Sequence, residues 1–316
     1  MGMLFNTFFG IACFSLALLQ SAACNPAATG QNNAIVSKTV VASPTPPKNS
    51  GMVGAKGDQG KMDLLTEKVL AKDPTATLLA KQIGPSAAAS LKPLAKNEDP
   101  VVREIALRSM EQSGGEGIAE VFAEALVDES PSVKSAALSG LEAHFSPSVY
   151  GQLLNAFDQL GDSPEVQRYV ALLLGRVETA NPKDLQQRYR QENNPIVNEG
   201  LVAALAKLGD ANAQRKFADG VEKSRDRERK RYIDDAAYID QPWAARSLAP
   251  VLLDKTDMLR IGVDGLPGAV PEYLRACDLA VNVIAKITKA NFTFPVNGRT
   301  NYTDAQLSEV RQFLIR

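Results

Sequence analysis

The sequence predicts an all-α protein in which residues 62–316 form a solenoid of stacked helix–turn–helix repeats. The main observation is a polar residue followed by proline, which recurs at spacings of 31, 33 and 31 residues: Asp99-Pro100, Ser130-Pro131, Ser163-Pro164 and Asn194-Pro195. Composition agrees, because only 6% of the residues are aromatic while Ala and Leu abound, which favours close helix packing over sheets. Hydrophobic residues make up 45% of the chain, enough for a packed core.

Each polar–proline dipeptide is expected to start a helix. The polar side chain accepts a backbone N–H, and proline loses nothing at the first helical position, where its N–H would have no partner. Two, six, seven and ten residues after each proline the chain is apolar, and these offsets share one helical face. The residues are Val102, Ala106, Leu107 and Met110; Val133, Ala137, Leu138 and Leu141; Val166, Val170, Ala171 and Leu174; and Val197, Leu201, Val202 and Leu205.

A second amphipathic helix is expected after each of these, for example over 118–126 and 149–157. One helix pair cannot bury its own apolar face, so neighbouring pairs must cover one another. We therefore expect about six to seven repeats, with the second helix of each pair lining the concave face. Before these repeats the sequence predicts a first helix pair over 63–83 and 85–95. After them it predicts a helix over 225–239, a partner helix that begins at Pro242, a connection over 253–271 and a helix over 272–289. A capping helix over 304–315 is expected to close the array, starting with a Thr303–Gln306 capping box.

These repeats resemble short HEAT repeats of the kind found in phycobilisome lyase proteins. The resemblance covers residues 73–290, most clearly 84–210, and residues 273–280 are similar to the closing segment of some bacterial HEAT-repeat proteins. It implies the fold, and it leaves open a lyase-like or other enzymatic activity. HEAT-type iron hydroxylases bind their metal through repeated His-Glu pairs, whereas this chain has a single histidine, His144.

Residues 1–23 are predicted to be a lipoprotein-like signal peptide. Residues 8–19 are apolar, and Ser21-Ala22-Ala23 supply the small residues of a cleavage site. Together with Cys24 they resemble a bacterial lipobox, although Ser21 stands where that pattern prefers Leu. The resemblance implies lipidation of Cys24, and Asn25 after it favours the outer membrane. Simple secretion and a retained single-pass anchor are the alternatives.

Residues 24–61 are predicted to be a disordered linker, because small and polar residues dominate and no apolar periodicity appears. A folded domain on such a tether is expected in the bacterial cell envelope, in the periplasm and anchored by lipid. Membrane contact is then expected only through the N-terminal lipid or anchor.

No catalytic, cofactor or metal site is predicted, so the chain is not expected to be an enzyme. The formal net charge is −1, and the charge run over 222–231 mixes acids with bases without interleaved aromatics. Nucleic acid is therefore not an expected partner, and a solvated, salt-bridged helix start explains the run. Cys277 is expected to be a small buried apolar residue.

The expected function is a scaffold or adaptor that binds a protein or peptide on its concave face. An accessory subunit of a membrane complex is a further alternative. The candidate contact residues form a basic ridge on two neighbouring second helices, with the single tryptophan as an anchor. They are Gln187, Arg188, Tyr189, Arg190, Arg215, Lys216 and Trp243. The competing interpretation of Trp243 is that it fills the seam between two repeats.

Overall fold

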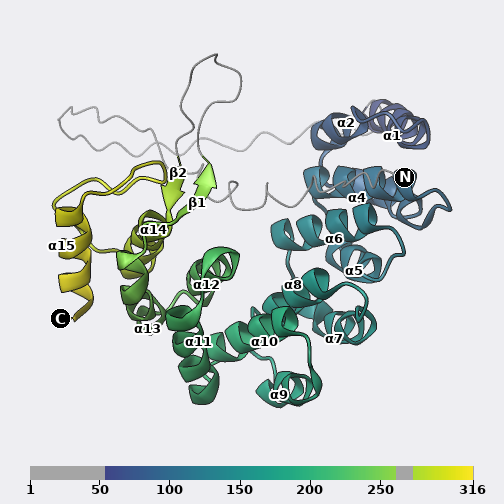
Figure 1. Cartoon of the computed structure of the whole chain (residues 1–316). Helices are drawn as coiled ribbons and strands as arrows, with labels where there is room; N and C mark the ends of the chain where they lie inside the picture. The colour runs from purple at the N-terminus through teal and green to yellow at the C-terminus, as the bar shows by residue number, and fades with distance from the viewer. Residues whose placement is uncertain (1–53, 261–272, 316) are drawn as a thin grey trace, which may run out of the picture.

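The computed structural model describes residues 54–260 and 273–315, which form a curved array of helices (Figure 1). The predicted all-α solenoid is confirmed. Helices on the inside of the curve alternate with helices on its outside. The inner series is α2 (Ala76–Ile83), α4 (Pro100–Ser113), α6 (Pro131–Ala143), α8 (Pro164–Leu174), α10 (Pro195–Lys207), α12 (Asp226–Ile239) and α14 (Ala276–Thr288).

The remaining elements lie outside this series or at its ends (Figure 1). The helices are α1 (Gly54–Leu70), α3 (Ala87–Leu91), α5 (Ile118–Ala125), α7 (Tyr150–Gln159), α9 (Pro182–Gln191), α11 (Ala211–Lys223), α13 (Pro242–Ser247) and α15 (Asp304–Ile315). Short 3-10 turns are η2 (Leu94–Lys96), η3 (Pro147–Val149) and η4 (Ala249–Leu253). Strands β1 (Asp257–Arg260) and β2 (Tyr273–Arg275) pair antiparallel, with Leu259 opposite Leu274.

The polar–proline dipeptides start α4, α6, α8 and α10, as predicted. The expected cap forms at two of them: Asp99 accepts from the Val101 N–H at 2.9 Å and Asn194 from the Ile196 N–H at 3.0 Å. The serines form no such cap. The Ser130 hydroxyl contacts Ser132 and the Ser163 hydroxyl donates to Asp162, so both hydroxyls are engaged elsewhere.

The predicted apolar face of each inner helix is buried. Of the sixteen positions read from the sequence, only Val166 and Leu138 are partly exposed. Together with apolar side chains of the outer helices they belong to one continuous core that runs along the array. Burial of this shared core is what holds successive repeats against each other.

The prediction that second helices line the concave face is wrong. The proline-started helices line it, and α5, α7, α9 and α11 lie on the outside (Figure 1). The apolar face of each inner helix points outward, because α5 packs on α6, α7 on α8 and α9 on α10. Helices α5, α7 and α9 thus each form a unit with the proline-started helix that follows, whereas α11 packs mainly on the preceding α10. The polar face of the inner helix is left for the concave side.

Three expected boundaries differ. Helix α1 begins at Gly54, before the expected boundary at residue 62, and the segment predicted as one helix over 63–83 is divided into α1 and α2. Lys72 lies between them with φ of 59°, a left-handed conformation that ends α1. The helix expected from residue 272 begins only at Ala276, because Tyr273–Arg275 pair with β1.

Candidate functional site

The candidate site is the polar stripe that the inner helices present on the concave side. Positions four and eight residues after each helix-starting proline lie opposite the buried face. On α4 these are Glu104 and Arg108, and on α6 Ser135 and Ser139. The Arg108 side chain is 45% exposed. On α6 the two serines are small, so they fill little of the space above the helix. In the described part of the chain, this half of the concave face is open to solvent.

Charged groups on this stripe are paired with one another. Arg108 Nε donates to Glu104 Oε1 at 2.8 Å within α4. The Ser139 hydroxyl donates to Glu111 at 2.7 Å, which links α6 to α4. Arg176, just after α8, donates to Glu142 of α6 at 3.0 Å. Each pair is partly exposed, so it is weakly held and able to exchange with charges from outside.

A buried ion pair closes the stripe farther along. Arg168 of α8 and Asp235 of α12 meet at 2.6 Å, with side chains only 5% and 3% exposed. The Tyr238 hydroxyl donates to the Leu172 carbonyl at 2.7 Å, so α12 also reaches the α8 backbone. These contacts skip α10, which lies between the two helices along the chain.

Helix α12 uses one face for this contact. Residues 231, 235 and 238 are spaced i, i+4 and i+7, and therefore lie side by side on a helix. Arg231 donates to both carboxylate oxygens of Glu199 on α10, at 2.7 and 3.1 Å. Lys207, the last residue of α10, donates to the Tyr238 carbonyl at 2.8 Å. The concave side of α10 is thus covered by the chain itself, and residues 201–206 are all buried.

Electrostatics at this contact reflect burial. Desolvation raises the pKa of Asp235 to about 6, against the attraction of Arg168. Desolvation likewise raises the pKa of Tyr238. Asp234, one residue away, is 51% exposed and pairs only with Lys230 of its own helix. No sequence motif indicated that Asp235 has a partner on α8.

Sequence reasoning also missed a polar clamp at a fixed position. Three residues after each proline stands a polar side chain that is buried or half-buried and bonds to a loop or to the last turn of the preceding outer helix. Arg103 donates to the Asn97 and Glu98 carbonyls and to Asp128, and Lys134 to the Ser163 hydroxyl. Gln167 donates to the Phe157 carbonyl and Asn198 to the Glu192 carbonyl. The signal was available, because offset three is polar in all four repeats.

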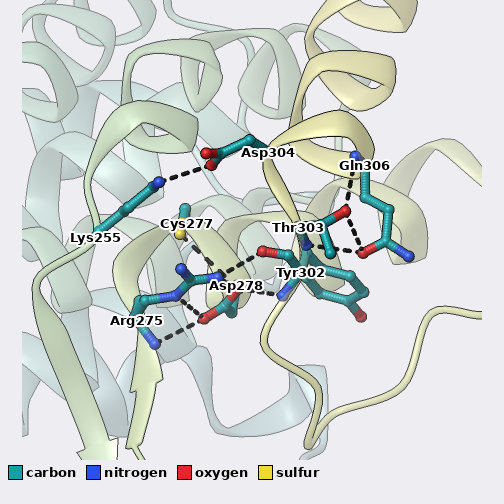
Figure 2. A network of polar contacts seen from close by, with 8 residues as sticks. All are labelled: Lys255, Arg275, Cys277, Asp278, Tyr302, Thr303, Asp304 and Gln306. Carbon is teal, nitrogen blue, oxygen red and sulfur yellow. Dashed lines mark hydrogen bonds and ion pairs between the residues drawn. The ribbon is translucent and has the colours of Figure 1, made fainter.

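A second polar network closes the C-terminal end (Figure 2). Asp278 is fully buried near the start of α14 and accepts from the Arg275 backbone, from its guanidinium, and from the Tyr302 N–H at 2.8 Å. The predicted capping box of α15 is present, with the Thr303 N–H donating to Gln306 at 2.8 Å. This network ties the segment before α15 to α14.

The candidate residues predicted on α9 and α11 lie on the convex side. Arg188 is held by Asp158 through two bonds at 2.8 and 2.5 Å, and Lys216 lies 4.4 Å from the centre of the Tyr189 ring. Arg215 donates to Asn212, while Gln187 and Arg190 are exposed.

The indole of Trp243 is half-buried and meets the ring of Phe217 edge-on at 5.8 Å. Its position on α13, packed against Phe217 of α11, favours the interpretation as a seam filler. Cys277 is buried, and desolvation raises the pKa of its thiol to about 11.

Some predicted features cannot be placed. Cys24, the signal peptide and the linker up to residue 53 lie outside the described residues. Among the described helices none is both long and apolar enough to cross a bilayer. Over 54–260 and 273–315 no three His, Cys, Asp or Glu side chains are arranged to hold a metal ion.

Comparison with known proteins supports HEAT-like repeats. A family model described as the HEAT repeat associated with sister chromatid cohesion matches residues 118–141. These residues span α5 and most of α6, which is the outer–inner unit seen in the packing. The solved structure of human deoxyhypusine hydroxylase in complex with glycerol is similar, at 16% identity and a TM-score of 0.33, over 84% of this chain and 98% of that chain. No curated protein sequence matches the chain.

Removing one partner of the buried ion pair should be costly. Asp235→Ala leaves the Arg168 guanidinium buried without a counter-charge, and we expect the free energy of unfolding to fall by about 3–5 kcal/mol. The matched control is Asp234→Ala, which removes an exposed pair and should change it by less than about 1 kcal/mol. Urea denaturation followed by circular dichroism measures both. Equal losses for the two variants would show that the pair between α8 and α12 is not a structural bridge.

The C-terminal network should respond to acid. Burial opposes ionisation of Asp278, but hydrogen bonds from Arg275 and Tyr302 outweigh it and hold its pKa below the ordinary value. Its contribution to stability is therefore present above the unfolded-state pKa of about 3.9 and is lost as pH falls through the lowered folded pKa. The stability gap between wild type and Asp278→Asn should shrink between about pH 5 and pH 2. A gap that stays constant across this range, measured by urea denaturation, would contradict the assignment.

Proposed function

We propose that this protein is a non-catalytic scaffold that binds a protein or peptide partner along the concave stripe of α4 and α6, as far as the pair of Glu142 with Arg176. The observation that carries the proposal is the difference between two halves of one surface. Over α10 the stripe is filled by α12 through Glu199, Arg231 and Lys207. Over α4 and α6 the equivalent positions are exposed or partly exposed: Arg108 pairs with Glu104 of its own helix, and the positions on α6 are serines.

The chemistry of the stripe favours a polypeptide. Acidic and basic groups alternate along it, as in the pairs of Glu104 with Arg108 and of Glu142 with Arg176. A polyanion such as nucleic acid needs a surface of one sign, whereas a polypeptide carries both signs and a backbone that bonds to either. Neighbouring helices lie about 8–10 Å apart, about the length of three residues of an extended chain, so a short segment is enough to cross both α4 and α6.

The absence of catalysis is part of the proposal. The sequence has a single histidine, so a His-based relay would rest on His144 alone. That ring already contacts the Glu111 carbonyl through Nε2 at 2.7 Å. The two carboxylates with the most enclosed surroundings, Asp235 and Asp278, are 2% and 0% exposed and paired with arginine. Neither is placed to reach a substrate.

The binding surface can be tested by site-specific photo-crosslinking in the cells that make the protein. A photoreactive residue in place of Arg108 should give one discrete adduct, because that position points into the open stripe. The matched control places the same residue at Gln187, which is exposed on the convex side. Ser135→Arg should remove the Arg108 adduct by filling the floor between α4 and α8. Adducts at Gln187 but not at Arg108, or at neither, would refute concave binding.

We also propose that the scaffold is held in a bacterial cell envelope through its N-terminus. The support is the sequence alone: an apolar segment over residues 8–19, small residues 21–23, and Cys24 followed by a polar stretch. A lipid on Cys24 would leave the helical array free at the end of a flexible tether, with its concave face accessible.

Intact-mass measurement of the protein purified from membranes tests this anchor. Cleavage before Cys24 with a diacylglycerol adduct on its sulfur is the expected result. The control variant Cys24→Ser should lose the adduct and move to the soluble fraction. An unprocessed chain that begins at Met1 would rule out both lipidation and cleavage.

A further inference from the structure

The inner helices are not equally close to one another. Adjacent backbones of α4 and α6, and of α8 and α10, approach along most of their length, whereas few residues of α6 and α8 come close together. Figure 1 shows α4 and α6 nearly parallel and α8 tilted relative to α6. The seam between α6 and α8 is therefore the loosest junction among the inner helices from α2 to α14.

Glycines explain why the next junction is tight. A Cβ on Gly175 would lie 2.8 Å from the Ala204 Cα and 2.2 Å from the Tyr238 hydroxyl oxygen. A Cβ on Gly200 would lie 2.7 Å from the Cγ of Arg168. Both contacts are shorter than van der Waals packing permits, so only glycine lets α8, α10 and α12 approach this closely.

Beyond this seam the helices are locked. The buried pair between Arg168 and Asp235 and the bond from Tyr238 to the Leu172 carbonyl connect α8 directly to α12. Helix α10 lies between them and bonds to α12 through Glu199. Each of the three helices is therefore held in place by contacts with the other two. Rotation of one of them would break buried polar contacts, which is costly.

The α6–α8 seam is bridged by polar contacts that are only partly buried. Lys134 of α6 donates to the Ser163 hydroxyl at the start of α8 at 3.0 Å, and a second contact lies at the other end of the seam. Glu142 and Arg176 meet at 3.0 Å with side chains 47% and 32% exposed. The guanidinium of Arg176 also lies 5.6 Å from the centre of the Phe145 ring, and its Nη1 is buried without a hydrogen-bond partner. Exposed ion pairs contribute little stability and re-form in water at low cost.

We propose that the seam between α6 and α8 is a hinge, at which the arm formed by α1 to α6 swings against the block formed by α8, α10 and α12. The pair of Glu142 and Arg176 holds the arm in its closed position. Because the pair of Glu142 and Arg176 lies at the end of the open stripe, the swing changes the spacing of α6 and α8 beside it. The hinge is a property of the free chain and does not depend on what the stripe binds.

Single-molecule fluorescence transfer on the full chain tests the hinge without a partner. Cys13→Ser and Cys24→Ser leave only the buried Cys277. One label pair, Gln82→Cys with Asp219→Cys, spans the seam from α2 to α11. The expected result is a distance distribution broader than the measurement noise.

The control pair lies beyond the seam, with Gln191→Cys at the end of α9 and Gln241→Cys just before α13. Its distribution should be narrow. Equal widths for the two label pairs would overturn the hinge, whatever their mean distances.

The role of the ion pair is decided by charge reversal. Glu142→Lys should shift the across-seam distribution to lower transfer efficiency and leave the control pair unchanged. The double variant Glu142→Lys with Arg176→Glu restores opposite charges and should return the distribution to that of the wild type. A double variant that behaves like the single one, or a single variant without effect, would remove Glu142 and Arg176 from the proposal.

Discussion

One interaction, the buried ion pair between Arg168 and Asp235, decides where the open concave surface ends. Two charges leave water only where geometry compensates, and here they do so at 2.6 Å from helices two positions apart in the inner layer. The pair draws α12 over the concave side of α10 and so ends the open stripe. The pair thereby divides the concave surface into an accessible part over α4 and α6 and a part over α10 that α12 covers.

Polar groups at regular positions determine how the repeats are oriented, while the apolar core only holds them together. The side chains at offset three each bond the start of an inner helix to a neighbouring segment, a loop for Arg103, Lys134 and Asn198 and the last turn of α7 for Gln167. A hydrophobic face tolerates sliding and rotation, because burial depends on area and not on direction. Hydrogen bonds to specific carbonyls do depend on direction, so they set the rotation of each helix about its axis.

The sequence predicted the parts of the fold that repeat and missed those that occur once. Proline in four successive dipeptides located α4, α6, α8 and α10, and offsets of two to ten residues identified their buried faces. Which helix of a pair lies inside could not be read from periodicity, because both are amphipathic. The contact of Arg168 with Asp235 joins residues 67 apart and belongs to no motif. The pairing of β1 with β2 was missed for the same reason. For the candidate surface, the concave location was inferred from the architecture of solenoids. The residues chosen on α9 and α11 were wrong for that face, because the second helix of each pair had been assigned to the concave side.

The contact that skips α10 also changes how the chain can come apart. In a regular solenoid each repeat senses only its two neighbours, so opening spreads inward from either end one unit at a time. Here α8, α10 and α12 must open together, because freeing α12 exposes Arg168 and α10 at once. Fraying from the C-terminus should therefore halt at α12, and the slowest-exchanging amides should belong to α10 rather than to the geometric middle of the array.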